Sequence, residues 1–280
     1  MKRVSPLLEH EADSTVLDLA PSPWVLRRCN TTGFVFLENP PGYEVLHDEL
    51  AWQVTYQREC EARAAAEPVR YAISAGLKRM RRALKRHKVA DLTQSLMPLI
   101  KNPQIRLLDL GCGSGQLLGV VMDRLPPALR QRCVPYGIEI STELAHLAQQ
   151  ALTPFHGRCL HASALDGLAQ FETEFFDLIV MSSFLEHEIQ PLPLLRISAQ
   201  RLRSGGYIIV KVPNYDSWNR HLRGSRWCGF RWPDHVNYFT PATLRAMAEA
   251  AGFKVTRMSL ADRFPLSDSL YAVLQKQPVA

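Results

Sequence analysis

The sequence lacks the features of a secreted, membrane-spanning or disulfide-bonded protein. Its six cysteines are scattered over 280 residues and include no C-x-x-C pair, so we expect reduced thiols. The first residues, MKRVSPLLEHEADS, contain no long apolar run, and we expect no secretory signal. No uninterrupted apolar stretch is long enough to span a bilayer. These absences predict a cytoplasmic protein without a transmembrane segment.

A large excess of charge of one sign is also lacking. The chain has 33 basic and 27 acidic residues, which gives a net charge of +6. This excess permits an anionic partner without requiring one. The apolar content of 46% is ordinary for a globular protein, and the length suits one large α/β domain with additions. The function must therefore be sought in local motifs.

The strongest local motif is LLDLGCGSGQLLG, residues 107–119. It combines the end of an apolar strand (105–110), a turn with three glycines and the start of a helix. This succession lets backbone N–H groups approach a ligand at a helix N-terminus, and a side chain at a glycine position would fill that space. Asp109 precedes the first glycine. Its carboxylate would repel a pyrophosphate but would suit a ligand that carries an ammonium and a sulfonium group.

The glycine spacing is G-x-G-x-G, whereas dinucleotide-binding folds have G-x-G-x-x-G. Together with the acidic residue, this spacing resembles the nucleotide-binding motif of class I S-adenosylmethionine-dependent methyltransferases. An ordinary β–α turn of another α/β protein is the alternative. The resemblance implies S-adenosylmethionine as cofactor, with contacts from Asp109, Gly111, Cys112, Gly113 and Gly115.

Two further strand ends extend this resemblance. A second strand over residues 134–140 ends near Glu139, which in the methyltransferase fold bonds both ribose hydroxyls. A surface glutamate is the alternative. A third strand over 158–162 leads into the turn where the family contacts adenine, and Ser163 stands there in place of the usual acid. The resemblance thus implies further cofactor contacts from Glu139, Ile140, Ser163, Ala164 and, at the end of the fourth strand, Ser182.

The fourth and fifth strands are predicted over residues 176–182 and 207–212. Their succession SSFLEH…RLRSGG-YIIVKVPN closely resembles the ubiquinone-biosynthesis O-methyltransferases. In those enzymes an acidic residue three positions before the Glu-His pair helps hold a divalent cation, and here that position is Ser183. Glu186 and His187 alone give few ligands to a hard cation. We therefore expect no metal, and a structural capping role for the pair.

Residues 214–240 are crowded with tryptophan, arginine and histidine. Their end, WPDHVNYFT, and the later Ala-Gly-Phe resemble the type-23 methyltransferase domain family, which carries H-x-x-x-F-[ST] before a helix that ends in A-G-F. Thr240 and Pro241 are expected to open this helix, and Gly252 to close it. Two last strands should follow as a hairpin.

Five β–α units and a terminal hairpin predict an α/β fold. We expect a Rossmann-like seven-stranded mixed sheet of order 3-2-1-4-5-7-6, with helices on both faces and only the seventh strand antiparallel. The class I methyltransferase domain should occupy residues 101–280. Its insertion at 214–240 should form one side of the acceptor pocket. Residues 1–100 should form a small N-terminal extension whose first residues, 1–23, are poorly fixed.

The N-terminal extension resembles a small zinc ribbon that precedes the methyltransferase domain in many bacterial relatives. Its C-x-x-C-G knuckle reads here Cys29-Asn30-Thr31-Thr32-Gly33. Tetrahedral zinc needs four ligands, mostly sulfur or imidazole, and one cysteine cannot make that site. We therefore expect a degenerate ribbon without metal, followed by a helical cap over residues 46–63.

A strongly basic segment, AGLKRMRRALKRHK, spans residues 75–88. Such a helix can lie on an anionic membrane or on nucleic acid. The favoured interpretation is that its apolar stripe packs on the domain and its basic face is solvated. A nucleic-acid-modifying methyltransferase is one alternative, although no Asn-Pro-Pro-Tyr-type motif follows the fourth strand. A non-catalytic S-adenosylmethionine-binding protein is another.

The predicted reaction requires few catalytic groups. Methyl transfer from a sulfonium mainly needs alignment of acceptor, methyl and sulfur. A hydroxyl acceptor must also lose a proton, and a neutral histidine suits that task. His235 is the first candidate, with Asp234 or a backbone group holding its tautomer. Anchoring of the insertion by His235 is the alternative. The predicted function is methylation of a small-molecule or glycan-like acceptor at oxygen.

Overall fold

The computed structural model describes residues 3–42 and 87–277, and single helical positions at Glu61, Ala65, Ala72 and Gly76. The predicted cap over 46–63 and the basic segment up to Arg86 lie almost entirely outside the described residues. No helix within the described ranges is both long and apolar enough to cross a bilayer.

A seven-stranded sheet forms the body of the protein, in the order β10-β11-β8-β7-β4-β5-β6. Strand β11 is antiparallel to both of its neighbours, and the other pairs are parallel. Numbered along the chain, this order is 3-2-1-4-5-7-6, so the predicted fold is confirmed. The strands are β4 (Ile105–Leu110), β5 (Cys133–Glu139), β6 (Arg158–His161), β7 (Phe176–Ser182), β8 (Leu202–Pro213), β10 (Phe253–Arg257) and β11 (Ser269–Lys276).

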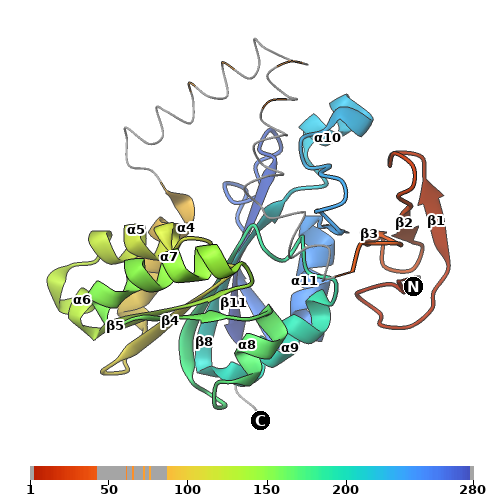
Figure 1. Cartoon of the computed structure of the whole chain (residues 1–280). Coiled ribbons are helices and arrows are strands. Elements are labelled where there is room, and N and C mark those ends of the chain that lie inside the picture. The colour runs from red at the N-terminus through yellow and green to blue at the C-terminus, as the bar shows by residue number, and fades with distance from the viewer. Residues whose placement is uncertain are drawn as a thin grey trace.

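Helices cover both faces of this sheet, as Figure 1 shows. Leu107 and Leu178 point to one face, while their neighbours Leu108 and Ile179 point to the other. Because both faces are covered, the central strands read as continuous apolar runs. One face carries α4 (Lys88–Leu96), α5 (Gln116–Arg124) and α7 (Thr142–Leu152), with α6 (Pro127–Arg132) beside them; the other carries α8 (Ala164–Ala169), α9 (Pro191–Arg201) and α11 (Pro241–Ala250).

Helix α11 begins and ends as predicted. The Thr240 side chain accepts a hydrogen bond from the N–H of Thr243, and Thr243 reciprocates, which makes a capping box. Pro241 occupies the first turn, where its missing N–H is no loss. Gly252 follows the helix with φ +85°, the left-handed conformation that glycine adopts readily.

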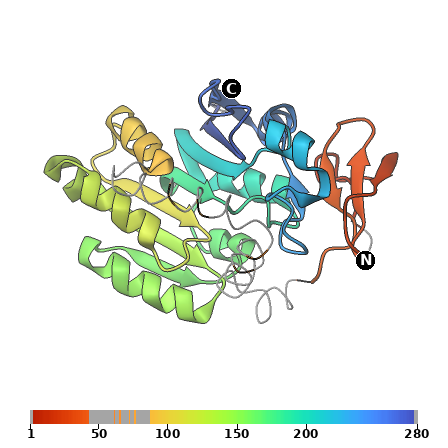
Figure 2. The ribbon, with the colours of Figure 1, turned by 90° about the horizontal axis from the view of Figure 1, so that it is seen from above.

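The N-terminal segment joins the end of the insertion in a second, four-stranded sheet (Figure 2). Here β3 pairs antiparallel with β9, which lies 200 residues further along the chain. The predicted loose arm is wrong for residues 3–23, because Arg3 donates to Val236 O at 3.0 Å and to Asn237 Oδ1 at 2.7 Å. The strands are β1 (Ser14–Leu17), β2 (Leu26–Cys29), β3 (Val35–Leu37) and β9 (Asn237–Tyr238).

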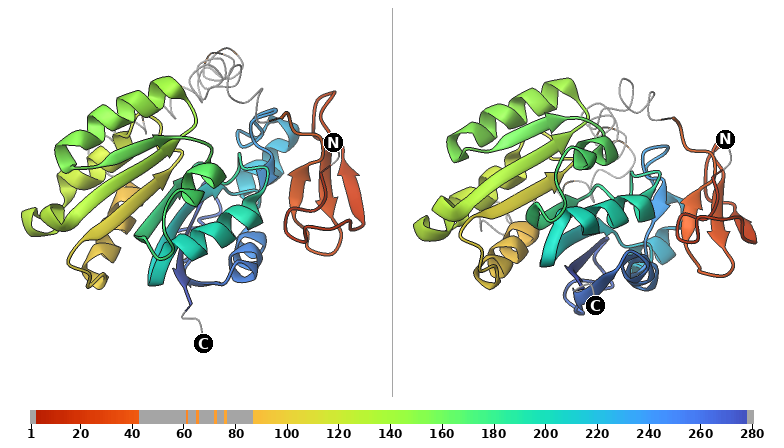
Figure 3. Two further views of the ribbon diagram at one scale, coloured as in Figure 1. Left: turned by 60° about the horizontal axis from the view of Figure 1, so that its bottom comes forward. Right: turned by 90° about the horizontal axis from the view of Figure 1, so that it is seen from below.

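The insertion lies between this small sheet and the terminal hairpin, as both views in Figure 3 show. It contains α10 (Trp218–Arg223) and an aromatic cluster. Asp268, just before β11, fixes it by accepting hydrogen bonds from Trp227 Nε1 at 2.7 Å and Ser217 Oγ at 3.1 Å. The insertion is therefore held from two sides. The cluster comprises Tyr215, Trp227, Phe230, Trp232 and Tyr238.

Candidate functional site

The glycine turn has the predicted geometry. Gly111, Gly113 and Gly115 have φ values of +66°, +54° and +78°, which other residues adopt only with strain. A Cβ on Gly111 would lie 2.4 Å from the Phe184 ring. The turn therefore passes directly against the loop that follows β7, and it leads into the N-terminus of α5.

Glu139, at the end of β5, is bound to this turn. Its Oε2 accepts a hydrogen bond from the N–H of Gly113 at 2.8 Å. Its Oε1 accepts hydrogen bonds from the N–H groups of Ile140 and Ser141, both at 3.0 Å. The side chain is buried. Glu139 therefore faces the turn and is not a surface glutamate, whereas its contact with a ribose stays a prediction.

Asp109 lies buried near the end of β4, two residues before Gly111. Burial, and secondarily the charge of Glu139, raise the pKa of Asp109 to about 8. Two acidic groups at the carboxyl end of adjacent strands make this edge of the sheet a place for a cation-bearing ligand. Such a ligand favours the ionised form of Asp109 and would lower its pKa again.

We expect the protein without ligand to lose stability as the pH rises from about 4 to 8. The folded pKa of Asp109 lies near 8 and its ordinary value is 3.8, so in this window only the folded state holds the proton. Its contribution is fully present below the unfolded pKa and is lost as the pH rises through the folded pKa. Asp109→Asn should flatten this decline in urea unfolding at pH 5 and pH 8. An unchanged pH slope in the variant would contradict the assignment.

The remaining predicted cofactor residues lie at the same edge. Ser163 begins α8 as its N-cap, and its hydroxyl accepts from the N–H of Asp166 at 3.2 Å. Ala164 follows, largely buried. Ser182 ends β7 opposite Lys211 of β8. Parallel strands bring these carboxyl ends together beside β4, which is where open α/β sheets bind ligands.

The ammonium group of Lys211, on β8, lies against Ser183 in the loop after β7. Ser183 donates its N–H to Lys211 O at 2.8 Å, and Lys211 Nζ donates to Ser183 Oγ at 2.8 Å. Burial raises the pKa of Glu186 to about 7, against the opposing charges of Lys211 and Arg231. The loop thus combines a nearby ammonium with a deeply buried carboxyl group.

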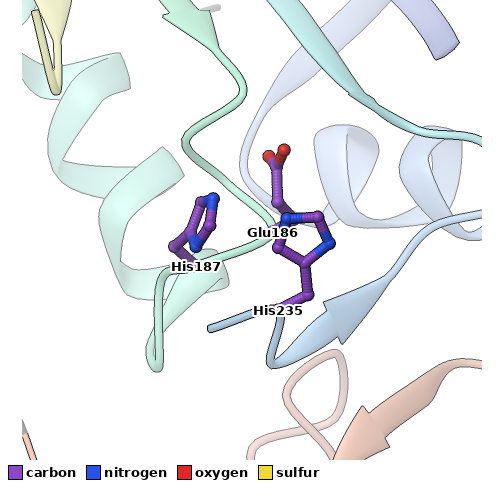
Figure 4. Close-up of side chains that lie close together, drawn as sticks. All are labelled: Glu186, His187 and His235. Carbon is purple, nitrogen blue, oxygen red and sulfur yellow. The ribbon is translucent and has the colours of Figure 1, made fainter. Parts of the chain in front are cut away.

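The structure brings His235 to Glu186 and His187 (Figure 4), with potential ligand atoms within 4.8 Å of one another. His187 Nδ1 donates to Asp234 O at 2.9 Å, and His235 Nδ1 donates to Gly229 O at 2.8 Å. A backbone carbonyl therefore holds the tautomer of His235, and Asp234 instead orients the other ring through its carbonyl. In the neutral tautomer the basic nitrogen of His235 is Nε2.

Backbone contacts lock this cluster together. The N–H groups of Val236 and Asn237 donate to Glu186 O at 2.8 Å and 3.0 Å. The sequence did not associate His235 with Glu186, because 48 intervening residues separate them. A usable signal was present, since both follow adjacent parallel strands whose ends meet at one edge.

The cluster suits a hard divalent cation poorly. It offers one carboxylate and two imidazoles, whereas magnesium and calcium prefer several oxygen ligands. The charge of Arg231 acts on both Glu186 and His187, and Lys211 acts on Glu186. Burial, and secondarily Arg231, lower the pKa of His187 to about 4, so it is neutral at pH 7. Glu186 Oε2 has no hydrogen-bond partner among the described residues.

We expect no stoichiometric metal in the purified protein, at this cluster or at Cys29. The positive charges of Lys211 and Arg231 oppose a dication, and Cys29 belongs to no group of three potential ligands within residues 3–42 and 87–277. Elemental analysis after incubation with magnesium and with zinc checks this expectation. One tightly held ion per chain would overturn it, and its loss in His235→Asn would place the ion at the cluster.

The sequence profile of a family described as a methyltransferase domain matches residues 78–258. Ubiquinone biosynthesis O-methyltransferase from Aeromonas salmonicida is 28% identical over 181 residues, which cover 58% of this chain and 68% of that protein. The Burkholderia thailandensis protein of the same name is 26% identical, and the match covers 59% of this chain and 74% of that protein. Trans-aconitate 2-methyltransferase from Streptomyces avermitilis is 30% identical, covering 52% and 53%.

Solved structures resemble the sheet and its helices. A methyltransferase in complex with the Haloferax volcanii Trm112 activator is 17% identical with a TM-score of 0.51, covering 66% of this chain and 89% of that one. The cyclase SpnF is 19% identical with a TM-score of 0.50, and the match covers 69% of this chain and 82% of that one. At these identities the likeness shows the fold alone, and a fold does not by itself decide the chemistry.

Proposed function

The chain belongs to this methyltransferase domain family, and from that premise we propose that it methylates an oxygen atom of a small-molecule or glycan-like acceptor. The family match covers more than half of the chain, so the protein is an S-adenosylmethionine-dependent methyltransferase. The atom and the class of acceptor are the proposal. The observation that carries it is the contact between His187, in the loop after β7, and the buried His235, whose rings have centroids 4.7 Å apart.

The proposed cofactor contacts follow the strand ends. Glu139 would hold the ribose hydroxyls, and the turn from Gly111 to Gly115 would accommodate the rest of the nucleoside and the amino acid part. Ser163 and Ala164 would lie beside the adenine. The cofactor supplies an activated methyl group, so the protein needs chiefly to bind and align it.

The proposed acceptor site is formed by the loop after β7 and the insertion. The Phe184 ring lies against Gly111, and the backbone of Glu186 holds Val236. These contacts connect the glycine turn to His235 through one loop. His235 would take the acceptor proton on Nε2. The names of the relatives support a hydroxyl or carboxylate of a small molecule as the methylated group.

The nucleic-acid alternative draws less support. Lys88, the last residue of the basic segment, donates to Ala261 O at 2.6 Å and pairs with Asp262 Oδ1 at 2.9 Å. This cation therefore fastens α4 to the loop before β11. Cysteines without a pairing pattern support a cytoplasmic location as part of the proposal.

Acceptor profiling tests the proposed function. The purified chain is incubated with methyl-labelled S-adenosylmethionine and separate pools of phenols, carboxylic acids, sugars and nucleic acids. We expect label in a hydroxyl-bearing small-molecule pool and none in nucleic acid. Label in RNA or DNA would favour the alternative. Cofactor binding without transfer to any pool would favour a non-catalytic binding protein.

A further inference from the structure

Cys112, in the glycine turn, lies beside Cys159 of β6. Their Sγ atoms are 3.7 Å apart. Gly137 of β5 makes this arrangement possible, because a Cβ there would lie 2.5 Å from Cys112 Sγ and 3.3 Å from Cys159 Sγ. The two sulfur atoms share the space that any other residue at position 137 would fill.

Both cysteines are held in place by consecutive residues of β5. Cys159 of β6 is in register with Gly137, and the N–H of Cys112 donates to Ile138 O at 3.3 Å. The backbones of both cysteines are therefore fixed next to each other by the sheet. A disulfide bond has an S–S length of about 2.05 Å, so the two sulfur atoms need to approach by less than about 2 Å.

We propose that Cys112 and Cys159 form an oxidative modification site, at which a peroxide-class oxidant converts the two thiols into an intramolecular disulfide that distorts the cofactor-binding turn. The inference rests on the proposed cofactor contacts of Gly111, Gly113 and Glu139. Disulfides of this kind in a reducing compartment are transient and serve as redox sensors.

The chemistry balances with hydrogen peroxide as the only co-reactant. The Cys159 thiolate attacks one oxygen, the O–O bond breaks, and hydroxide leaves with the proton of the thiol as water. The sulfur of Cys112 then attacks the resulting sulfenic acid; the S–S bond forms, the S–O bond breaks, and a second water leaves. In sum, two thiols and one peroxide give one disulfide and two waters.

Cys159 is the thiol suited to react first. It is half-buried, whereas Cys112 is buried. The hydrogen bond from Cys112 lowers the pKa of the Cys159 thiol, although burial opposes this effect. Cys112 is then the resolving thiol, already in contact with the oxidised sulfur.

Closure of the disulfide displaces the turn because Cys112 is part of it. The carbonyl oxygen of Cys112 accepts a hydrogen bond from the N–H of Gly115 at 3.0 Å. The next residue, Gly113, donates to Glu139 at 2.8 Å. Movement of Cys112 toward β6 strains both bonds. We expect the affinity for the cofactor to fall about tenfold or more, as for the loss of one charged hydrogen bond.

The test compares reduced and peroxide-treated full-length protein. Digestion without reductant and mass spectrometry should find the peptide that links Cys112 to Cys159. Calorimetry with S-adenosylhomocysteine should show the weakened binding, and dithiothreitol should restore it. Cys159→Ser should bind normally before and after peroxide. Cys228→Ser, which removes another half-buried thiol, should respond as the parent does.

Two results would overturn the inference. One is the absence of the linked peptide at peroxide concentrations that oxidise Cys228. The other is unchanged S-adenosylhomocysteine affinity in protein shown to be linked. The reduced Glu139→Ala variant separates the two proposals. If that variant binds normally, the cofactor assignment fails as well; if it binds weakly, only the effect of the disulfide is refuted.

Discussion

Replacing His235 by asparagine should lower turnover by about 10²-fold or more while leaving cofactor affinity unchanged. The asparagine amide can still donate to Gly229 O, as Nδ1 now does at 2.8 Å. It offers no basic nitrogen at the position of Nε2. The substitution therefore preserves the anchor and removes the proposed proton acceptor. Turnover and S-adenosylhomocysteine binding are the two measurements.

Two further variants distinguish proton transfer from anchoring. His235→Gln places an amide nearer to Nε2 and loses the Gly229 contact, so it should be both less stable and inactive. His221→Asn is the matched control, because His221 lies exposed on α10 in the same insertion and should tolerate the change. Normal turnover of His235→Asn would mean that the ring only anchors the insertion and that the enzyme works by alignment.

The parallel core was predictable because its signals are local. Strand β7 has the predicted limits, Phe176–Ser182, since a strand buried on both faces is a continuous apolar run. The glycine turn was predictable for a different reason. A positive φ at three alternate positions leaves glycine as the residue that fits without strain, so the backbone conformation is visible in the sequence itself.

The second sheet was not predictable, because its pairing joins residues far apart in the chain. Strand β9 has two residues and carries no periodicity of its own. The hydrogen bonds of Arg3 were equally unpredictable from the sequence, since its partners Val236 and Asn237 lie more than 230 positions away. Ordered N-terminal residues depend here on long-range hydrogen bonds, which composition and local pattern do not reveal.

The candidate site also contains residues that the sequence reveals and residues that only the fold reveals. Asp109 and Glu139 were identifiable because each ends a recognisable strand. The cluster of His187 and His235 was not, although the sequence points to each histidine separately. Burial and the nearby Arg231 determine the protonation state of His187, and both are properties of the folded chain. The contact between the two histidines arises only when folding brings the loops after β7 and β8 together.

Replacing Glu139 by alanine should weaken cofactor binding by about 1–3 kcal/mol, because charged hydrogen bonds contribute on this order. Each loss of about 1.4 kcal/mol lowers the affinity for the cofactor tenfold. Two effects add in this variant. The proposed ribose contacts disappear, and the N–H of Gly113 loses the acceptor that now lies 2.8 Å away. Calorimetry with S-adenosylhomocysteine measures the sum.

Glu139→Gln is an intermediate case, because it removes one of the two acceptor oxygens and keeps the other. Its side chain has the same length, but its amide offers one acceptor oxygen where the carboxylate offers two, so it cannot satisfy Gly113 together with Ile140 and Ser141 as the native group does. We expect an affinity between those of the parent and Glu139→Ala. Glu143→Ala is the matched control, since this exposed acid follows Glu139 closely in the chain, at the start of α7. Equal affinities of the parent, Glu139→Ala and Glu143→Ala would refute the ribose assignment.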